Sequence, residues 1–161
     1  MNYTSITQNV DGKIFLTGSV FPIKDARIIS GFPDTNYGLE QSVRMAQIDQ
    51  WMWGFFGNLM ANKKLNLYIF SVLGTFGGTF KIYETDNDWI ETDITWNNKP
   101  ALGDLIEELS APAVGWWQVS TGTTGSICIV GYNLSTDKYE ILTYSKQYTT
   151  DETKRPYISN P

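Results

Sequence analysis

Carboxylates and tryptophans gather in residues 87–100, which read NDWIETDITWNNKP. Glu91 and Asp93 are two residues apart, so in an extended chain they share one face. A glycosidase needs two carboxyl groups on either side of the scissile bond, and neighbours on one short segment do not straddle it. We therefore expect no catalytic centre here and predict that the protein is not an enzyme.

Histidine is absent from the sequence, and Cys128 is the only cysteine. A histidine-based triad is thus excluded, and transition metals lose their commonest ligand. Cys128 lies in the apolar segment SICIVGY, where a small buried strand residue is the expected role.

Oxygen ligands for calcium occur in two loop segments. One contains Asp34 and Asn36, and the other contains Asp86 and Asp88. Backbone carbonyls can complete a calcium site of about six to eight oxygens, although neither segment has EF-hand spacing. Asx turns explain the same residues equally well, so both interpretations stay open. A structural calcium is the one cofactor that we predict.

Several tryptophans are candidates for sugar binding, because a sugar presents flat C–H faces to exposed aromatic rings. Trp51 and Trp53 are two residues apart and share one face of a strand, whereas Trp116 and Trp117 must point to opposite faces. We predict Trp51, Trp53 and Trp116 as carbohydrate-binding residues. For Trp89 and Trp96 we favour the core, where they would hold a loop against the domain.

Basic side chains complete this predicted site. Arg44 and Lys81 are the candidates for holding an acidic polysaccharide, and Lys146 and Arg155 have the same charge. The formal net charge is −5, so a basic patch has to be local. The same charge disfavours nucleic acid and anionic membranes as partners.

The composition predicts one all-β domain. The chain has 161 residues, 42% of them apolar and 18% charged, with 14 glycines and many aromatic residues, which is typical of strands and turns. Its most apolar segment, WMWGFFG, is too short to span a membrane, and the first residues lack the features of a secretion signal.

Alternating patterns predict the individual strands, and we expect Phe80, Ile82, Ile127 and Ile129 to share one core. Gly77 and Gly78 fit a hairpin turn. The helical candidate is residues 104–110, with Asp104 and Glu107 as a capping box. The expected strands lie at 13–18, 26–30, 64–73, 77–85, 116–121, 126–132, 139–145 and 155–159, with a loop at 31–38.

A series of motifs resembles a known family. They are SGFPDTNYG, WGFFGNL, KLNLYIF, the pattern W-x-E-x-x-I-T-W-N-N-x-P at residues 89–100, WWQVS, YSKQ and KRPYI. Together they resemble the disaggregatase-related (DNRLRE-type) β-sandwich, which overlaps the carbohydrate-binding modules attached to polysaccharide lyases. The resemblance implies a two-sheet, antiparallel, jelly-roll-like sandwich without a catalytic centre. Members often carry S-R-E where this chain has Ser145, Lys146 and Gln147, so a role of that glutamate does not transfer.

We expect the sandwich at residues 25–161, preceded by an N-terminal extension at 1–24. A short last strand leaves an edge that the extension of another chain could pair with, which would favour self-assembly. Two functions stay open. One is a glycan-binding module outside the cell or on its surface. The other is a structural subunit of a virion, as a decoration, fibre or tail protein, or of an extracellular filament.

Overall fold

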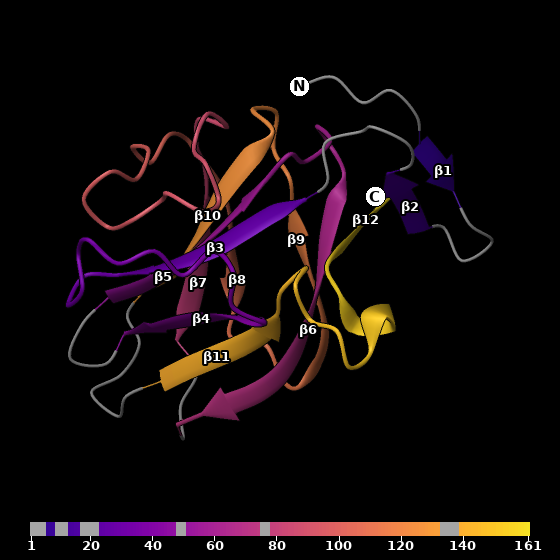
Figure 1. Cartoon of the computed structure of the whole chain (residues 1–161). Helices are drawn as coiled ribbons and strands as arrows, with labels where there is room; N and C mark the ends of the chain where they lie inside the picture. Colours follow the sequence, from indigo (N-terminus) through magenta and orange to yellow (C-terminus); the bar gives the residue numbers. More distant parts are fainter. Residues whose placement is uncertain (1–5, 9–12, 17–22, 48–50, 75–77, 133–138) are drawn as a thin grey trace.

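The computed structural model describes residues 6–8, 13–16, 23–47, 51–74, 78–132 and 139–161. These residues form twelve strands, all paired antiparallel, and one short 3-10 helix (Figure 1). The elements are β1 (Ile6–Gln8), β2 (Lys13–Leu16), β3 (Lys24–Ile29), β4 (Ser42–Gln47), β5 (Trp51–Gly57), β6 (Lys64–Leu73), β7 (Thr79–Glu84), β8 (Leu105–Ser110), β9 (Gly115–Ser120), β10 (Ser126–Tyr132), β11 (Tyr139–Tyr144), η1 (Glu152–Lys154) and β12 (Tyr157–Ser159).

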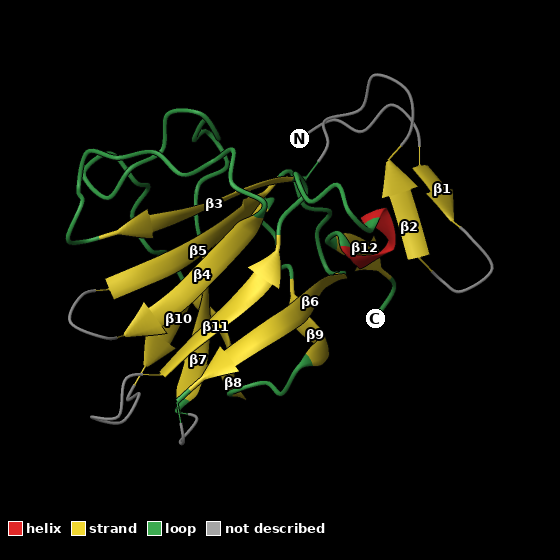
Figure 2. Ribbon diagram, turned by 60° about the horizontal axis from the view of Figure 1, so that its bottom comes forward, coloured by secondary structure: helices red, strands yellow, loops and turns green. Residues whose placement is uncertain are grey.

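The strands form two packed layers, as predicted for an antiparallel sandwich (Figure 2). One layer, here called the first layer, contains β3, β5, β10, β7 and β8. The second layer contains β4, β11, β6 and β9, and β12, β2 and β1 continue from β6. The layers are joined at one corner, where β4 pairs with β5 through Ala46↔Met52 and Gln47↔Trp51. The sandwich is thus a single hydrogen-bonded sheet that folds over on itself.

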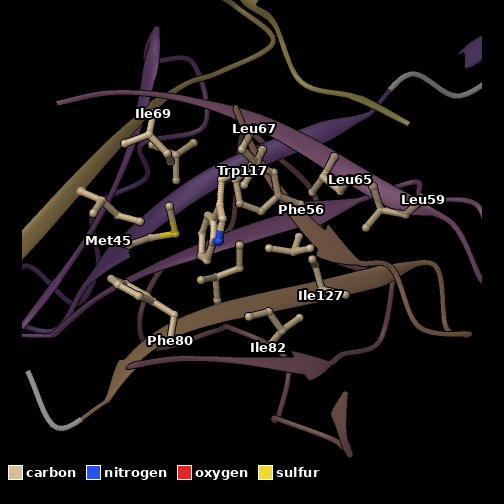
Figure 3. Close-up of a cluster of buried hydrophobic side chains, with 14 of the residues drawn as sticks. Met45, Phe56, Leu59, Leu65, Leu67, Ile69, Phe80, Ile82, Trp117 and Ile127 are labelled. Atoms are coloured by element: carbon tan, nitrogen blue, oxygen red, sulfur yellow. The ribbon is translucent and has the colours of Figure 1, made fainter. Parts of the chain in front are cut away.

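The main core lies between the two layers (Figure 3). Phe80, Ile82, Ile127 and Ile129 are fully buried in this one cluster, which confirms the prediction. The second layer adds aliphatic side chains by simple alternation along β6, where every other residue points inward. The other members of the core cluster are Val43, Met45, Phe56, Leu59, Leu65, Leu67, Ile69, Trp117, Val119, Ile141 and Ile158.

The predicted helix at residues 104–110 is wrong, because Leu105–Ser110 form strand β8. The strand pairs along β7, with Ile82 opposite Glu107. Glu107 does not close a capping box, since its Oε1 accepts the N–H of Ser120 at 2.5 Å. A short segment has weak helical preference, and the unpaired hydrogen-bonding groups of the β7 edge decide its conformation.

The predicted hairpin turn at Gly77 and Gly78 does not join neighbouring strands. β7 pairs with β10 and β8, whereas β6 pairs with β9, β11 and β12, so the chain crosses from one layer to the other after β6. Gly77 itself lies outside the described residues, as do residues 17–18 of the strand predicted at 13–18. The other predicted strands and the loop at 31–38 are confirmed with small changes at their ends.

The N-terminal segment pairs within its own chain. β2 lies beside β12 through Ile14↔Ile158 and Lys13↔Ser159. Exchange of this segment between chains, and the boundary between residues 24 and 25, stay predictions. In the part of the chain that the structure describes, there is no helix of the length and hydrophobicity that a membrane span requires.

Truncation of Phe56 tests the core. Phe56 is fully buried, so Phe56→Ala should lower the free energy of unfolding by about 3–5 kcal/mol. Urea denaturation followed by tryptophan fluorescence measures this change. Phe32 is 57% exposed, so Phe32→Ala is the matched control and should change stability by no more than about 0.5 kcal/mol. Equal effects of the two variants would contradict the assigned core.

Candidate functional site

A long loop at residues 85–104, coloured pink to salmon in Figure 1, covers the outer face of the first layer. Trp89 and Ile94 from this loop are buried against strand residues. The outer face of a sheet would otherwise meet water, so this second small core makes the first layer buried on both sides. The strand residues that the loop covers are Ala26, Ile28, Phe55, Cys128 and Val130.

Trp89 fixes the loop, as predicted for a tryptophan that clamps a loop to the core. It is only 8% exposed, and its Nε1 donates to Ser126 Oγ at 2.8 Å. The ammonium of Lys24 lies 4.4 Å from the ring centroid. The same ammonium donates to the backbone carbonyls of Asn87, at 2.6 Å, and of Trp89. The indole is thus held from its edge and from its face, and it offers no ring surface to a ligand.

Glu91 has a structural role in the loop. Its Oε1 accepts the backbone N–H of Asp25 at 2.9 Å, and its Oε2 pairs with Lys146 Nζ at 2.9 Å. Asp93 is exposed and contributes its backbone carbonyl to Asn98 Nδ2 at 2.9 Å. The two carboxylates that could be imagined as an acid and base pair therefore have separate environments and do not face a common cleft.

Asp25, on β3, is a buried acid that the sequence analysis missed. Burial raises the pKa of Asp25 to about 8, the N–H of Lys146 opposes this shift, and the negative charge of Glu91 adds to it. Asp25 Oδ2 accepts that N–H at 2.7 Å. No pattern in the sequence marks this position, because Lys146 and Glu91 come from distant segments.

The residues predicted for calcium are engaged in loop hydrogen bonds. Asn36 Nδ2 donates to the carbonyls of Glu91 and Ile94, both at 2.8 Å. Asp34 Oδ1 accepts from Asn97 Nδ2 at 2.7 Å. These contacts brace one loop against another, and the Asx-turn interpretation is matched by the N–H of Gly38, which donates to Asn36 Oδ1 at 3.1 Å.

The second predicted calcium segment forms an Asx turn, in which Asp86 Oδ1 accepts the N–H of Asp88 at 2.9 Å. No group of three or more histidine, cysteine or acidic side chains that could hold a metal occurs among the described residues. Calcium therefore stays a prediction. Asp86 and Asp88 lie on an open depression of about 560 Å³, whose other lining residues are Trp89, Ile90, Asp93, Ile94, Asn98, Pro100 and Ala101.

Trp51 and Trp53 point to the side of β5 that the loop covers, and both are half-buried. The ring of Trp53 lies against that of Trp96, with centroids 4.7 Å apart. The ammonium of Lys99 lies 4.1 Å from the Trp96 centroid and 5.6 Å from that of Trp53. Contacts within the protein therefore already cover much of these rings.

The basic candidates lie in different layers. Arg44 is on β4 of the second layer, where its Nε is 3.5 Å from Glu140 Oε2. Lys81 is on β7 of the first layer and alternates with the core residues Phe80 and Ile82, so it points away from the core. The structure thus does not bring all of the predicted sugar-binding residues into one site.

Trp116 is the most exposed of the candidate tryptophans, at 43%, whereas Trp117 is buried, as the opposite orientation of neighbours predicts. The ring of Trp116 makes T-shaped, edge-to-face contacts with two tyrosines. The centroids of Tyr68 and Tyr157 lie 5.2 and 5.1 Å away. Trp116 therefore lies between the rings of Tyr68 and Tyr157, roughly perpendicular to both, on the outer side of the second layer.

Further rings continue this surface, which we call the aromatic face. Tyr144 stacks on Tyr148 with centroids 3.7 Å apart, and on Phe70 with centroids 4.2 Å apart. Tyr68 lies 6.1 Å from Tyr144 in a nearly parallel orientation. The aromatic face consists of Tyr68, Phe70, Trp116, Tyr144, Tyr148 and Tyr157.

Alternation in β6 could have identified part of the aromatic face, since Tyr68 and Phe70 point away from the core residues Leu67 and Ile69. The contribution of Tyr144 could not be found in this way. The pairing of β11 with β6 brings it there.

Polar groups border the aromatic face. Asn66 Oδ1 accepts from Gln118 Nε2 at 2.8 Å, and Gln118 is exposed. The ammonium of Lys154 lies 4.9 Å from the centroid of Tyr68. A hydrogen bond between the Tyr144 and Tyr148 side chains raises the pKa of Tyr144. Rings together with amide, hydroxyl and cationic groups are the combination that a sugar site requires.

Removal of the Trp89 hydrogen bond tests the loop clamp. Trp89→Phe leaves a ring but loses the bond to Ser126, so we expect the free energy of unfolding to fall by about 1–3 kcal/mol. Urea denaturation followed by circular dichroism gives the value. Trp116→Phe is the matched control and should change it by about 0.5 kcal/mol or less, because Trp116 is exposed. A Trp89→Phe protein as stable as the control would contradict the clamp.

Comparison with known families assigns the chain. Residues 17–124 match carbohydrate-binding module family 96, and this range is more than half of the 161 residues. The range contains the tryptophan motif of the loop and Trp116, whereas Tyr144, Tyr148 and Tyr157 follow it. Comparison with curated proteins gives no match, and the relationship to the disaggregatase-related family stays a prediction. The chain belongs to carbohydrate-binding module family 96.

Proposed function

We propose that the protein is a non-catalytic module that binds polysaccharide on its aromatic face. The observation that carries this proposal is the exposed ring of Trp116, which continues into the stacked rings of Tyr68, Tyr144 and Tyr148. A sugar unit can place its C–H face on the exposed ring of Trp116, and the stacked tyrosines beside it present ring edges and hydroxyl groups to the next units. The exposed Gln118 lies beside it and can hydrogen-bond to hydroxyl groups, and the buried Asn66 orients the Gln118 amide.

The aromatic face is favoured over the loop-covered face. Trp53 and Trp96 contact each other and Lys99, and Trp89 is buried, so sugar stacking there would require the loop to move. Trp51 and Trp53, with Lys81 on the same layer, remain the second candidate site. Variants of the two faces separate these possibilities.

Cationic groups that border the aromatic face are the support for our proposal that the ligand is an acidic polysaccharide. Lys154 and Arg155 adjoin the aromatic face, where Arg155 Nε donates to the carbonyl of Tyr148 at 2.6 Å. Arg44 is on the same layer. Each of these three cations has a carboxylate partner, since Asp151 lies 3.8 Å from Lys154, Glu152 lies 3.3 Å from Arg155 and Glu140 lies 3.5 Å from Arg44. Such a ligand fits a module that acts outside the cell or at its surface.

The proposal predicts that Trp116→Ala weakens binding at least about tenfold, because exposed tryptophans at the centre of a binding surface contribute strongly. Isothermal titration with one neutral glucan and one polyuronate measures affinity and ligand class together. Trp53→Ala is the matched variant on the other face and should bind as the wild type does. Melting curves of both variants show whether they are folded.

Three results would change the assignment. Full affinity in a folded Trp116→Ala protein would overturn the proposed site. Loss of binding in a folded Trp53→Ala protein would place the site under the loop. Absence of binding, together with self-association in light scattering, would favour the alternative of a structural subunit in a virion or extracellular filament. The contact available for exchange in that case is the short β2–β12 pairing.

Calcium is tested on the same sample. If Asp34, Asn36, Asp86 or Asp88 holds a structural calcium, excess calcium should raise the melting temperature and a chelator should lower it, because a ligand that binds only the folded state stabilises it. The reversal of the shift when calcium is restored is the control. An unchanged melting temperature would contradict the calcium prediction and leave these residues as loop braces.

A further inference from the structure

We propose that a cluster of the buried Asp25 with the half-buried Glu91 and Lys146 positions the Tyr144–Tyr148 stack and thereby tunes ligand binding on the aromatic face with pH. The inference rests on the proposed function for its binding part. Its structural part, the link between the cluster and the ring stack, can be tested without a ligand. The three residues do not touch the aromatic face and act through the turn that carries its tyrosines.

The turn at residues 144–148, which directly follows β11, links the cluster to the ring stack. The turn is closed by the N–H of Tyr148, which donates to the carbonyl of Ser145 at 3.1 Å. Ser145 is buried, and its Oγ donates to the carbonyl of Glu40 at 2.6 Å. Tyr144 and Tyr148 therefore lie at the two ends of one tight turn. Their rings stack with centroids 3.7 Å apart and an angle of 14° between the planes.

The cluster holds this turn at Lys146, which lies between the two tyrosines in the chain and contacts both Asp25 and Glu91. The backbone N–H of Lys146 donates to Asp25 Oδ2 at 2.7 Å, and its ammonium pairs with Glu91 Oε2 at 2.9 Å. Glu91 Oε1 in turn accepts the N–H of Asp25 at 2.9 Å. Both the backbone and the side chain of Lys146 are thus fixed by β3 and by the loop at 85–104. A shift of Lys146 must move the tyrosine on each side of it.

The protonation of Asp25 sets the charge of the cluster. Burial raises the pKa of Asp25 to about 8, so below this pH Asp25 is neutral and stands beside the ion pair of Glu91 and Lys146. The charged groups around Asp25 are Glu91 and Lys146, and Lys24 interacts with Glu91 in turn. Above pH 8, Asp25 becomes a second carboxylate in a buried place, which is unfavourable. The ionised carboxylate attracts the Lys146 ammonium and repels Glu91, so we infer that the ion pair between Lys146 and Glu91 then rearranges.

The sign of the stability effect follows from the same shift. The folded state keeps the proton of Asp25 up to about pH 8, whereas the unfolded state releases it near 3.8. The stabilisation is complete below the unfolded value and is lost as the pH rises through the folded value. The Asp25→Asn protein lacks this titration and keeps an oxygen acceptor for the Lys146 N–H. Its melting temperature should therefore fall less between pH 4 and 8 than that of the wild type.

The experiment compares the wild type and Asp25→Asn between pH 6 and 9. One readout is the near-ultraviolet circular dichroism of the tyrosines, and the other is affinity for the polysaccharide that the wild type binds. For the wild type we expect a spectral change centred near pH 8 and a several-fold loss of affinity. For Asp25→Asn we expect neither. Ionisation of Tyr144 does not interfere, since its pKa is raised above the ordinary value of 10.

A second pair of variants tests Lys146. Lys146→Met should alter the tyrosine spectrum and weaken binding several-fold at pH 7, whereas Lys146→Arg, which keeps the ion pair, should restore both. Lys63→Met removes a charge elsewhere, where Lys63 Nζ contacts Asn160 on the surface, and is the matched control. It should leave the spectrum and the pH profile of affinity unchanged.

The two readouts separate the possible failures. A spectrum that is independent of pH and of the Lys146 variants would overturn the link between the cluster and the ring stack, whatever the affinity does. A spectrum that changes as expected while the affinity stays constant would overturn the role of the stack in binding. In that case the Trp116→Ala result decides whether the aromatic face binds polysaccharide at all.

Discussion

Burial of the first layer on both of its faces is the constraint on which the rest of the structure depends. Its central strand, β10, sends Ile127 and Ile129 into the main core and Cys128 and Val130 to the opposite side. Apolar side chains on that opposite side need a cover, and the loop at 85–104 supplies it. The tryptophan-rich segment thus owes its composition to the fold.

A covering loop must also satisfy its backbone polar groups, and here side chains do so. Lys24, Asn36, Asn98 and Lys99 donate to loop carbonyls, and Gly38 passes so near Glu91 that a Cβ atom would lie 1.8 Å from its carbonyl oxygen. The polar residues that resembled a calcium site are part of this network. The loop packs its tryptophans against the first layer, whereas the exposed ring of Trp116 lies on the second layer.

Sequence reasoning succeeded where a local period decides the outcome. Alternation placed Phe80, Ile82, Ile127 and Ile129 in one core and turned Trp116 outward and Trp117 inward. It failed at residues 104–110, where a short amphipathic segment completes the edge of β7 instead of forming a helix. Strand pairing between distant segments overrode a weak local preference there.

The sequence by itself determined the all-β class, most of the strands and the relation to carbohydrate-binding modules, because side-chain alternation and motif spacing are local properties. Only the tertiary structure decided which aromatic residues share a surface. The pairing of β11 with β6 brings Tyr144 beside Phe70, and on the opposite layer Trp53 packs against Trp96 of the covering loop. It also decided that Asp25 is buried beside Glu91 and Lys146. Contacts between distant segments depend on the topology of the sheet, which the local pattern does not encode.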